Sequence, residues 1–441
     1  MFTIYSILYA IAFFFMAPYE YFKRPASLRR RWLSERFGRI DVTAAKSGSQ
    51  ARNKIWIHAV SVGEVAASVT LVRKLKEIYP LTDIVISTVT DTGQRVAAER
   101  MGQLARIVYV PFDLPWCVKA AAEAVQPDMF IIMETELWPN IIRLLHERGV
   151  PILLMNGRIS GKSFKGYLKV RFFIRRVLGY IAFFCMQEEP YAERIRLLGA
   201  SAERVAVTGN FKFDMQPVAE MPAWTSLLSG LTIIAGSTHM PEEDIVLDAY
   251  VQLRRQMPEL NLILAPRHPA RFDEVEELVR KRNVPYIKRS QIRESINEVE
   301  AGGAAAAHPH IRNAARAEGS GKVIILDVIG ELASVYGAAD IAIMGGSFIE
   351  HGGQNPLEPA FWGKAIVCGP HMENFPFIGG FYSQGAAKTT DASELLQTLD
   401  KLLRSPEKCS EMGRAARALY DSSTGATERA MVIIDRFIRT K

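Results

Sequence analysis

The order of hydrophobic and polar positions divides the chain into alternating strands and helices. Short apolar runs typical of buried strands recur from residue 55 onward, and segments of helical periodicity such as Trp116–Val125 and Asn140–Arg148 lie between most of them. This alternation predicts an α/β fold with a parallel, doubly wound sheet. The runs in the first half are Ile55–Val60, Ile84–Val89, Ile107–Phe112, Phe130–Met133, Ile152–Met155, Ile181–Met186 and Val205–Thr208.

A break at Asp214–Pro222 separates this series from a second one. Two prolines flank a polar stretch without periodicity there, which predicts a linker. Since 441 residues exceed the usual size of one core, we expect domains at 23–215 and 223–441, and leave open whether the last helix packs back onto the first. Ser290–Gly321 is expected to be a mobile surface excursion. The strands of the second series are Ile233–Ala235, Leu262–Ala265, Val323–Leu326, Ile341–Met344 and Ile366–Cys368.

The first 22 residues predict a single membrane anchor. Phe2–Ala17 is almost wholly apolar and aromatic residues follow it, as at a bilayer interface. Seven basic residues and one acid, Glu35, lie between Lys23 and Arg39, so the positive-inside rule places the rest of the chain in the cytoplasm. Because the apolar run is short, it either crosses the bilayer or lies in its interface.

Composition narrows the class of protein. With 49% hydrophobic and 23% charged residues the chain is globular, and its net charge of +7 favours acidic ligands or a membrane surface over nucleic acid. Four cysteines without CxxC spacing indicate free thiols in a reducing compartment.

A candidate catalytic carboxylate follows the first strand. The run from Trp56 passes through the turn Ser61-Val62-Gly63 into a helix that we expect to open at Glu64. This turn lies at the carboxyl edge of the predicted sheet, where α/β proteins bind ligands. Glu64 is therefore either a general base or a residue that only favours the positive end of its own helix.

Several further motifs occur in order along the chain. Taken together they closely resemble the Kdo transferases, which move 3-deoxy-D-manno-octulosonic acid (Kdo) from CMP-Kdo to the lipid A precursor on the cytoplasmic side of the inner membrane of Gram-negative bacteria. The resemblance runs from about Ile55 to Phe375. Its motifs are Ser61–Glu64, Met133–Asn140, Asn156–Ser160, Gly209–Asp214, Ala235–His239, Ala265–Pro269, Ile329–Leu332, Gly345–Ser347 and His351–Pro359.

The resemblance implies a GT-B fold, with two Rossmann-like domains facing a cleft, and an inverting transfer. It implies that Glu64 is the proton acceptor and that Glu134 and Lys212 stabilise the transition state. From the residues alone, the favoured interpretations are that Glu134 is a structural partner of the strand-end backbone and that Lys212 is a solvated surface amine.

The second domain is expected to bind the CMP of the donor. Arg267 follows a strand and suits a phosphate, although a surface ion pair is the alternative. A helix is expected to begin at Ile329-Gly330-Glu331, where the glycine lets a nucleotide approach the backbone. Another is expected with Asn355 as N-cap and Pro356 as its first residue. The expected contacts are Pro266, Arg267, Ile329, Gly330, Glu331, Asn355, Pro356, Leu357 and Glu358, the last of these on the ribose.

No metal or cofactor is expected. The chain contains no Asp-x-Asp motif, and His239, His268, His351 and His371 lack metal-ligand spacing. A dehydrogenase is excluded because no GxGxxG follows the first strand. Another GT-B transferase, for instance one that uses UDP, and a non-enzymatic membrane scaffold stay open.

One helix is expected to contact the lipid acceptor. Basic and aromatic residues interleave between Lys162 and Arg176, which predicts a helix with a basic face and an apolar face, suited to anionic lipid. A helix packed on the domain with a solvated basic side is the alternative.

Overall fold

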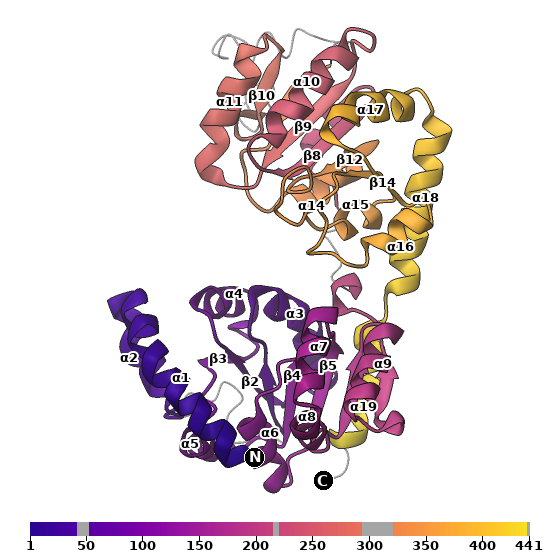
Figure 1. Cartoon of the computed structure of the whole chain (residues 1–441). Helices are drawn as coiled ribbons and strands as arrows, with labels where there is room; N and C mark the ends of the chain where they lie inside the picture. Colours follow the sequence, from indigo (N-terminus) through magenta and orange to yellow (C-terminus); the bar gives the residue numbers. More distant parts are fainter. Residues whose placement is uncertain (42–52, 215–219, 293–320, 439–441) are drawn as a thin grey trace. The chain divides into compact units, whose positions relative to one another are not determined.

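The computed structural model describes residues 1–41, 53–214, 220–292 and 321–438, which form two compact units (Figure 1). The first unit comprises Met1–Met215 and Ser423–Lys441, and the second comprises Gln216–Ser422. Each is built on a parallel sheet of seven strands, so the predicted α/β class is confirmed. The second unit ends at Ser422 rather than at residue 441, because the C-terminal helix belongs to the first.

The first sheet has the order β3-β2-β1-β4-β5-β6-β7. All seven predicted strands are present, with ends that differ by a few residues. β1 ends at His58 rather than Val60, because the Val60 N–H donates to the carboxylate of Glu64 at 2.7 Å instead of continuing the strand. The strands are β1 (Lys54–His58), β2 (Asp83–Thr88), β3 (Arg106–Tyr109), β4 (Met129–Met133), β5 (Ile152–Gly157), β6 (Phe183–Met186) and β7 (Val205–Val207).

Helices cover both faces of this sheet. Successive strand residues are buried on opposite sides: Trp56 packs in one core cluster, while Ile55 and Ile57 pack in the other. One cluster includes residues of α5 (Pro115–Val125), α6 (Pro139–Glu147), α8 (Arg171–Leu178) and α9 (Glu189–Leu198). The other includes residues of α3 (Val62–Ile78), α4 (Asp91–Met101) and α19 (Ala426–Ile438).

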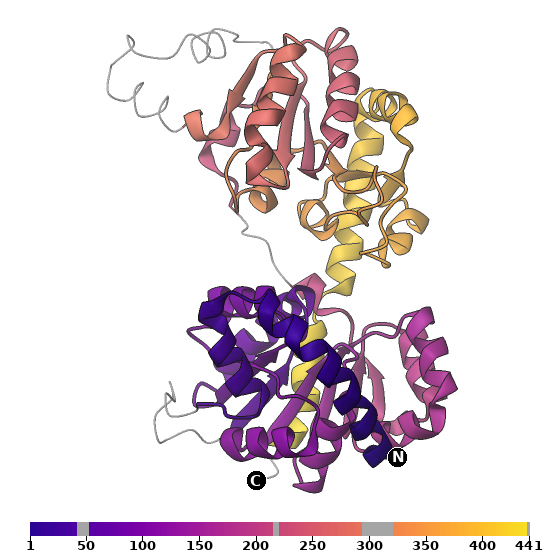
Figure 2. The ribbon, with the colours of Figure 1, turned by 60° about the vertical axis from the view of Figure 1, so that its left-hand side comes forward.

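The C-terminal helix α19 completes the first unit. It packs against α3, and both views show it among the elements of this unit (Figures 1 and 2). The carboxylate of Asp214 accepts hydrogen bonds from the backbone N–H groups at the start of α19, at 2.7 Å from Gly425. The last helix of the chain therefore packs on the first domain, which the sequence had left open.

The N-terminal helix α1 (Phe2–Lys23) lies along the first unit, followed by α2 (Ala26–Arg36). Its Tyr5 hydroxyl donates to Asp113 at 2.8 Å, and the Asn140 amide donates to Ser6 Oγ at 2.9 Å. Its length and composition would allow it to cross a membrane. Its exposed large apolar residues include Ile4, Ile7, Leu8, Ile11, Phe14, Phe15, Met16, Tyr19 and Phe22. The predicted anchor is thus joined to the domain along one side and exposed on another.

The predicted basic helix is two helices, α7 (Gly161–Lys169) and α8. Val170 leaves helical geometry between them, with φ −120° and ψ 28°. Phe164 and Phe173 pack against the core, whereas Phe172 is 80% exposed. The segment thus combines packed aromatic side chains with one solvent-facing aromatic ring.

The second sheet has the order β10-β11-β9-β8-β12-β13-β14. The five predicted strands are present, and two more lie at its edges. These two strands, β10 and β14, have three residues each, which is too short for a recognisable apolar run. The strands are β8 (Thr232–Thr238), β9 (Asn261–Pro266), β10 (Tyr286–Lys288), β11 (Val323–Ile325), β12 (Ile341–Met344), β13 (Ala365–Cys368) and β14 (Ala387–Thr389).

Helices and short loops complete the second unit. Apolar residues of α10, α11 and α17 pack on one face of the sheet, and Trp224, Val335 and Tyr336 pack on the other. Most of the predicted excursion Ser290–Gly321 and of the linker Asp214–Pro222 lies outside the described residues. The helices are α10 (Glu242–Arg254), α11 (Phe272–Lys281), α14 (Leu332–Val335), α15 (Leu357–Phe361), α16 (Ile378–Ser383), α17 (Leu395–Leu403) and α18 (Pro406–Ser423).

Candidate functional site

Glu64 is held at the start of α3 by local hydrogen bonds. The helix begins at Val62, two residues before the predicted start, with Ser61 as its N-cap. Glu64 Oε2 accepts from the Val60 N–H at 2.7 Å, and Oε1 accepts from Ser61 Oγ at 2.8 Å. Both oxygens are therefore positioned by the turn that ends β1.

Burial sets the protonation of this carboxyl. Its side chain is only 6% exposed, and loss of water raises the pKa of Glu64 to about 7. The carboxylates of Glu134 and Glu136 raise the pKa further, while the hydrogen bonds from Val60 and Ser61 lower it. A carboxylate with this pKa can accept a proton at neutral pH, which is what a general base must do.

Glu134 and Glu136 lie in the loop after β4. The Glu134 N–H donates to the Met155 carbonyl at 2.8 Å, and its backbone has φ 55°, in the left-handed region. Thr135 Oγ1 bonds to the backbone of Arg158 at 2.6 and 3.1 Å. A pocket of about 240 Å³ is lined by Glu134, Thr135, Glu136, Arg158, Ile159, Ser160, Ser163 and Tyr167. The pocket lies at the carboxyl edge of the sheet, and two carboxylates and one guanidinium line it.

Lys212 lies near Glu134, on a short 3-10 helix (Phe211–Asp214). The buried Asn156 holds this segment, since its Oδ1 accepts from the Phe211 N–H at 3.0 Å. Burial lowers the pKa of Lys212, and the nearby Glu134 opposes that shift. Burial likewise raises the pKa of Glu134, while Lys212 and Arg158 lower it.

The structure thus brings the three predicted catalytic residues into one electrostatically coupled group. Glu64 is coupled to Glu134, and Glu134 to Lys212. The sequence assigned no role to Glu136 or Arg158, although both lie in the quoted motifs. The signal was present in the Glu134-Thr135-Glu136 spacing after a strand, which places a second carboxylate in the same loop.

In the second unit, Arg267 and Glu358 are close enough to affect each other. Arg267 is exposed just after β9, and its charge lowers the pKa of Glu358, which burial raises. α15 begins at Leu357, so Asn355 is not its N-cap residue as predicted. Asn355 Oδ1 nevertheless accepts from the Leu357 N–H at 3.2 Å, and its amide donates to Glu358 at 3.4 Å. Asn355 therefore holds the first residue of α15 and orients the carboxylate of Glu358.

Glu331 is engaged by side chains of its own unit. Both of its oxygens accept from Arg289, at 2.8 and 2.9 Å, and one also accepts from Trp224 Nε1 at 3.1 Å. The predicted helix begins at Leu332. Ile329 is 79% exposed, and a Cβ added at Gly330 (φ 97°) would meet nothing within 4 Å. The backbone at Ile329 and Gly330 is therefore accessible, whereas the carboxylate of Glu331 is already paired with Arg289.

Glu242 was not recognised from the sequence, although it organises the glycine-rich loop. Its buried carboxylate accepts from three backbone N–H groups, those of His239 (2.9 Å), Gly346 (2.7 Å) and Phe348 (2.9 Å). Its position three residues after His239, in the first turn of a helix, was the available signal.

Three of the four noted histidines meet beside this loop. The ring of His239 lies 4.2 Å from His351 and 5.3 Å from His268, centroid to centroid. Burial and the neighbouring basic groups lower the pKa of His239 to about 4, so its imidazole is neutral. Among the described residues, no group of three His, Cys, Asp or Glu is placed to hold a metal ion. All four cysteines are free.

Comparisons with known proteins agree on one family. Residues 31–215 match the family described as 3-deoxy-D-manno-octulosonic-acid transferase (kdotransferase). The chain is 32% identical over 418 residues to the 3-deoxy-D-manno-octulosonic acid transferase of Haemophilus influenzae, covering 93% of this chain and 92% of the relative. It is 30% identical to that of Bordetella pertussis, with 91% of each covered.

Solved structures show the fold. MurG of Acinetobacter baumannii aligns with a TM-score of 0.55 and 15% identity, over 87% of this chain and 99% of its own. MnaA of Staphylococcus aureus, solved with UDP, aligns with a TM-score of 0.52 and 13% identity, over 88% of this chain and 98% of its own. The predicted GT-B architecture is therefore confirmed.

Proposed function

This chain belongs to the Kdo transferase family of glycosyltransferases, and we propose that it moves Kdo from CMP-Kdo to the lipid A precursor (lipid IVA) in lipopolysaccharide biosynthesis. The observation that carries the proposal is the buried Glu64 carboxyl, whose pKa of about 7 suits proton removal from an acceptor hydroxyl. One base suffices for a single in-line displacement, so the reaction inverts the anomeric centre.

The first unit supplies the groups that act during transfer. Glu64 takes the proton of the attacking hydroxyl. Lys212 offsets the negative charge of the donor carboxylate or of the departing phosphate, and Glu134 holds Lys212 or stabilises positive charge on the sugar. Their mutual coupling supports these roles.

The second unit binds the CMP of the donor. The exposed guanidinium of Arg267 suits the phosphate, and Glu358 suits the ribose hydroxyls. The open backbone at Ile329 and Gly330 admits the base, and Glu331 with Arg289 stiffens that loop. Pro266, Asn355, Pro356 and Leu357 shape the same site.

Competition between nucleotides tests the donor. We expect CMP to inhibit transfer from CMP-Kdo, and UDP at equal concentration to leave the rate unchanged. Stronger inhibition by UDP would favour the alternative, another GT-B transferase that acts on a membrane lipid.

The protein is proposed to sit on the cytoplasmic side of the bacterial inner membrane. Since α1 is bonded to the domain through Tyr5 and Ser6, its exposed apolar side supports a helix lying in the membrane interface. We expect the full-length chain to remain with membranes until detergent is added. Release of most of it by buffer alone would contradict this.

The pH dependence should report Glu64. Its ionised form is the base, so kcat/KM is expected to fall about tenfold per pH unit below about pH 7 and to level off above it. Initial rates between pH 5.5 and 8.5 measure this. A glutamate of ordinary pKa, about 4.3, would instead give a flat profile over that range.

Transfer is proposed to need no metal ion. Arg267 can offset the charge of the donor phosphate, and a displacement with one base requires no cofactor. We therefore expect at least about half of the activity to remain in excess chelator, since the protein's own cations supply the charge. Loss of all activity, restored by a divalent ion, would contradict the proposal.

The basic residues of α7 and α8 are proposed to attract the anionic acceptor. Lys165, Lys169 and Arg171 are exposed beside Phe172. Reversing these three charges is expected to raise the acceptor KM at least about tenfold, since each basic group near an anionic surface contributes about 1 kcal/mol before screening and three such groups are lost. The KM for CMP-Kdo should not change. An unchanged acceptor KM would indicate that these helices only pack on the domain and that their basic side is solvated.

A further inference from the structure

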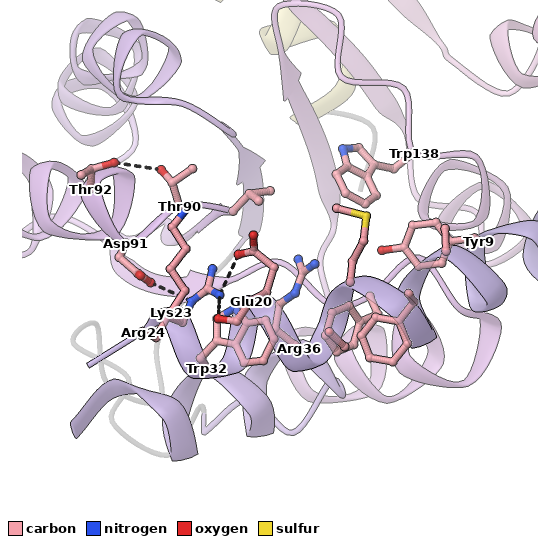
Figure 3. Close-up of a pocket in the computed structure, with 16 residues that line it drawn as sticks. Tyr9, Glu20, Lys23, Arg24, Trp32, Arg36, Thr90, Asp91, Thr92 and Trp138 are labelled. Atoms are coloured by element: carbon pink, nitrogen blue, oxygen red, sulfur yellow. Dashed lines mark hydrogen bonds and ion pairs between the residues drawn. The ribbon is translucent and has the colours of Figure 1, made fainter. Parts of the chain in front are cut away.

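A pocket of about 590 Å³ lies between α1, α2 and the loop after β2 (Figure 3). It belongs entirely to the first unit and is distinct from the group around Glu64. Its walls are largely apolar, and its charged lining residues are Glu20, Lys23, Arg24, Arg36 and Asp91. It is lined by Tyr9, Ala12, Phe13, Met16, Ala17, Glu20, Lys23, Arg24, Trp32, Arg36, Val89, Thr90, Asp91, Thr92, Phe112 and Trp138.

Arg36 is a buried cation to which no carboxylate of the described residues is bonded. Only 7% of it is exposed, its Nη1 donates to the Val110 carbonyl at 2.9 Å, and its guanidinium lies 4.2 Å from the Phe112 ring centre. Its Nε has no hydrogen-bond partner, and no carboxylate among the described residues bonds to it. A buried charge is costly unless it is paired, so this guanidinium calls for a negative group.

The neighbouring Arg24, which lines the same pocket, is paired with two carboxylates. It bonds to Glu20 at 2.9 Å and to Asp91 at 3.1 Å. Both acids bond to Arg24, whereas Glu20 acts on Arg36 only through its charge, without a hydrogen bond or ion pair. Figure 3 shows Arg36 between the Arg24–Glu20 pair and Tyr9.

Trp32 adds a second unpartnered donor. Its side chain is 2% exposed, and its indole N–H has no hydrogen-bond partner. A buried N–H without an acceptor costs free energy that a bound oxygen would remove. Two residues that line the same pocket thus each carry a buried, unpartnered N–H, and one of the two is charged.

The middle of α1 gives the pocket an apolar wall. Phe13, Met16 and Ala17 line the pocket, and Met16 is also largely exposed to the outside. A ligand that satisfies this pocket therefore combines an anionic group with a hydrocarbon chain, which describes a phosphorylated lipid.

We propose that the pocket binds the phosphate of an acylated lipid beside Arg36 and Trp32, with an acyl chain along α1. Two lipids have this chemistry, the acceptor and a bilayer phospholipid. That a phosphorylated lipid binds in this pocket does not depend on the proposed Kdo transfer. Only the identification of that lipid as the acceptor rests on the proposed function. Trp138 borders the pocket and follows Glu136 by two residues in the chain. An acceptor bound in this pocket would therefore lie next to the loop after β4, which carries Glu134 and Glu136.

A pair of matched lipids tests binding. Dioleoyl phosphatidic acid and dioleoylglycerol differ only in the phosphate, and both can be titrated into the full-length protein in neutral detergent and counted by native mass spectrometry. We expect the protein to prefer phosphatidic acid at least about tenfold, as a hydrogen bond to a charged group implies.

Variants locate the effect. Arg36→Met should abolish the preference, and Trp32→Phe should reduce it about threefold or more, since it removes a neutral donor and keeps the ring. Arg30→Met, an exposed arginine on the same helix, is the control and should keep the preference. An equal preference in wild type and Arg36→Met, or no preference in wild type, would overturn the proposal.

The acceptor KM, measured in detergent without phospholipid, distinguishes the two lipids. A tenfold rise in Arg36→Met would identify the acceptor as the occupant. An unchanged KM together with a lost preference for phosphatidic acid would identify a bilayer phospholipid. Loss of transfer in a Glu64 variant would not affect either binding result, so the two proposals fail separately.

Discussion

Replacing Glu64 by glutamine is expected to lower kcat by about 10²–10⁴-fold, the range that a general base supplies. Glutamine keeps the shape of the side chain and can still accept from the Val60 N–H, but it cannot take a proton. The donor KM and the affinity for CMP should stay within about twofold, because the proposed nucleotide contacts lie in the other unit. Glu64→Ala should lose activity to the same extent.

The control for this variant is Glu77→Gln on the same helix. Glu77 is exposed and forms an ion pair with Lys74 on the same helix, away from the candidate site, so its loss should leave kcat unchanged. Steady-state rates and a CMP titration on both variants measure the difference. Turnover of Glu64→Gln near the wild-type rate would remove Glu64 from the base role.

Lys212→Met should lower kcat about 10²–10³-fold, as loss of one group that stabilises transition-state charge does. The nearby Glu134 would also lose the positive charge that now lowers its pKa, so it would become protonated at a higher pH. Lys212→Arg keeps the charge and should recover part of the rate. The donor KM should change less than kcat, since the role is in the transition state.

Lys119→Met provides the matched control, because Lys119 is exposed on α5. Single-turnover rates at saturating donor separate the chemical step from binding. A Lys212→Met protein with normal kcat and a raised donor KM would show that Lys212 only binds the donor in its ground state.

Most of the fold follows from patterns that the sequence carries locally. Strands buried on both faces are short continuous apolar runs, so β1 and β4 were located to within a few residues. The edge strands β10 and β14 were missed because three residues carry too little pattern. The packing of α19 on α3 joins residues more than 350 apart, as in the contact of Tyr79 with Asp435, and periodicity does not report such distances.

The sequence indicated which residues gather at the candidate site, but it did not indicate how they change one another's pKa. The turn after β1 and the loop after β4 meet because parallel strands share a carboxyl edge, which the sequence indicates. The raised pKa of Glu64 arises from burial and from Glu134, 70 residues away in sequence, and needs coordinates. Likewise, the pairing of Glu331 with Arg289 joins two segments that no motif connected.

The most direct test of the account is the mass of the lipid product. Purified full-length protein is incubated with lipid IVA, CMP-Kdo and a chelator, and the lipid is analysed by mass spectrometry beside the Glu64→Gln protein. We predict that the wild type adds whole Kdo residues and that the variant adds none. An unmodified lipid with the wild type, or an equal yield from Glu64→Gln, would contradict the proposal that this chain is a Kdo transferase that uses Glu64 as its base.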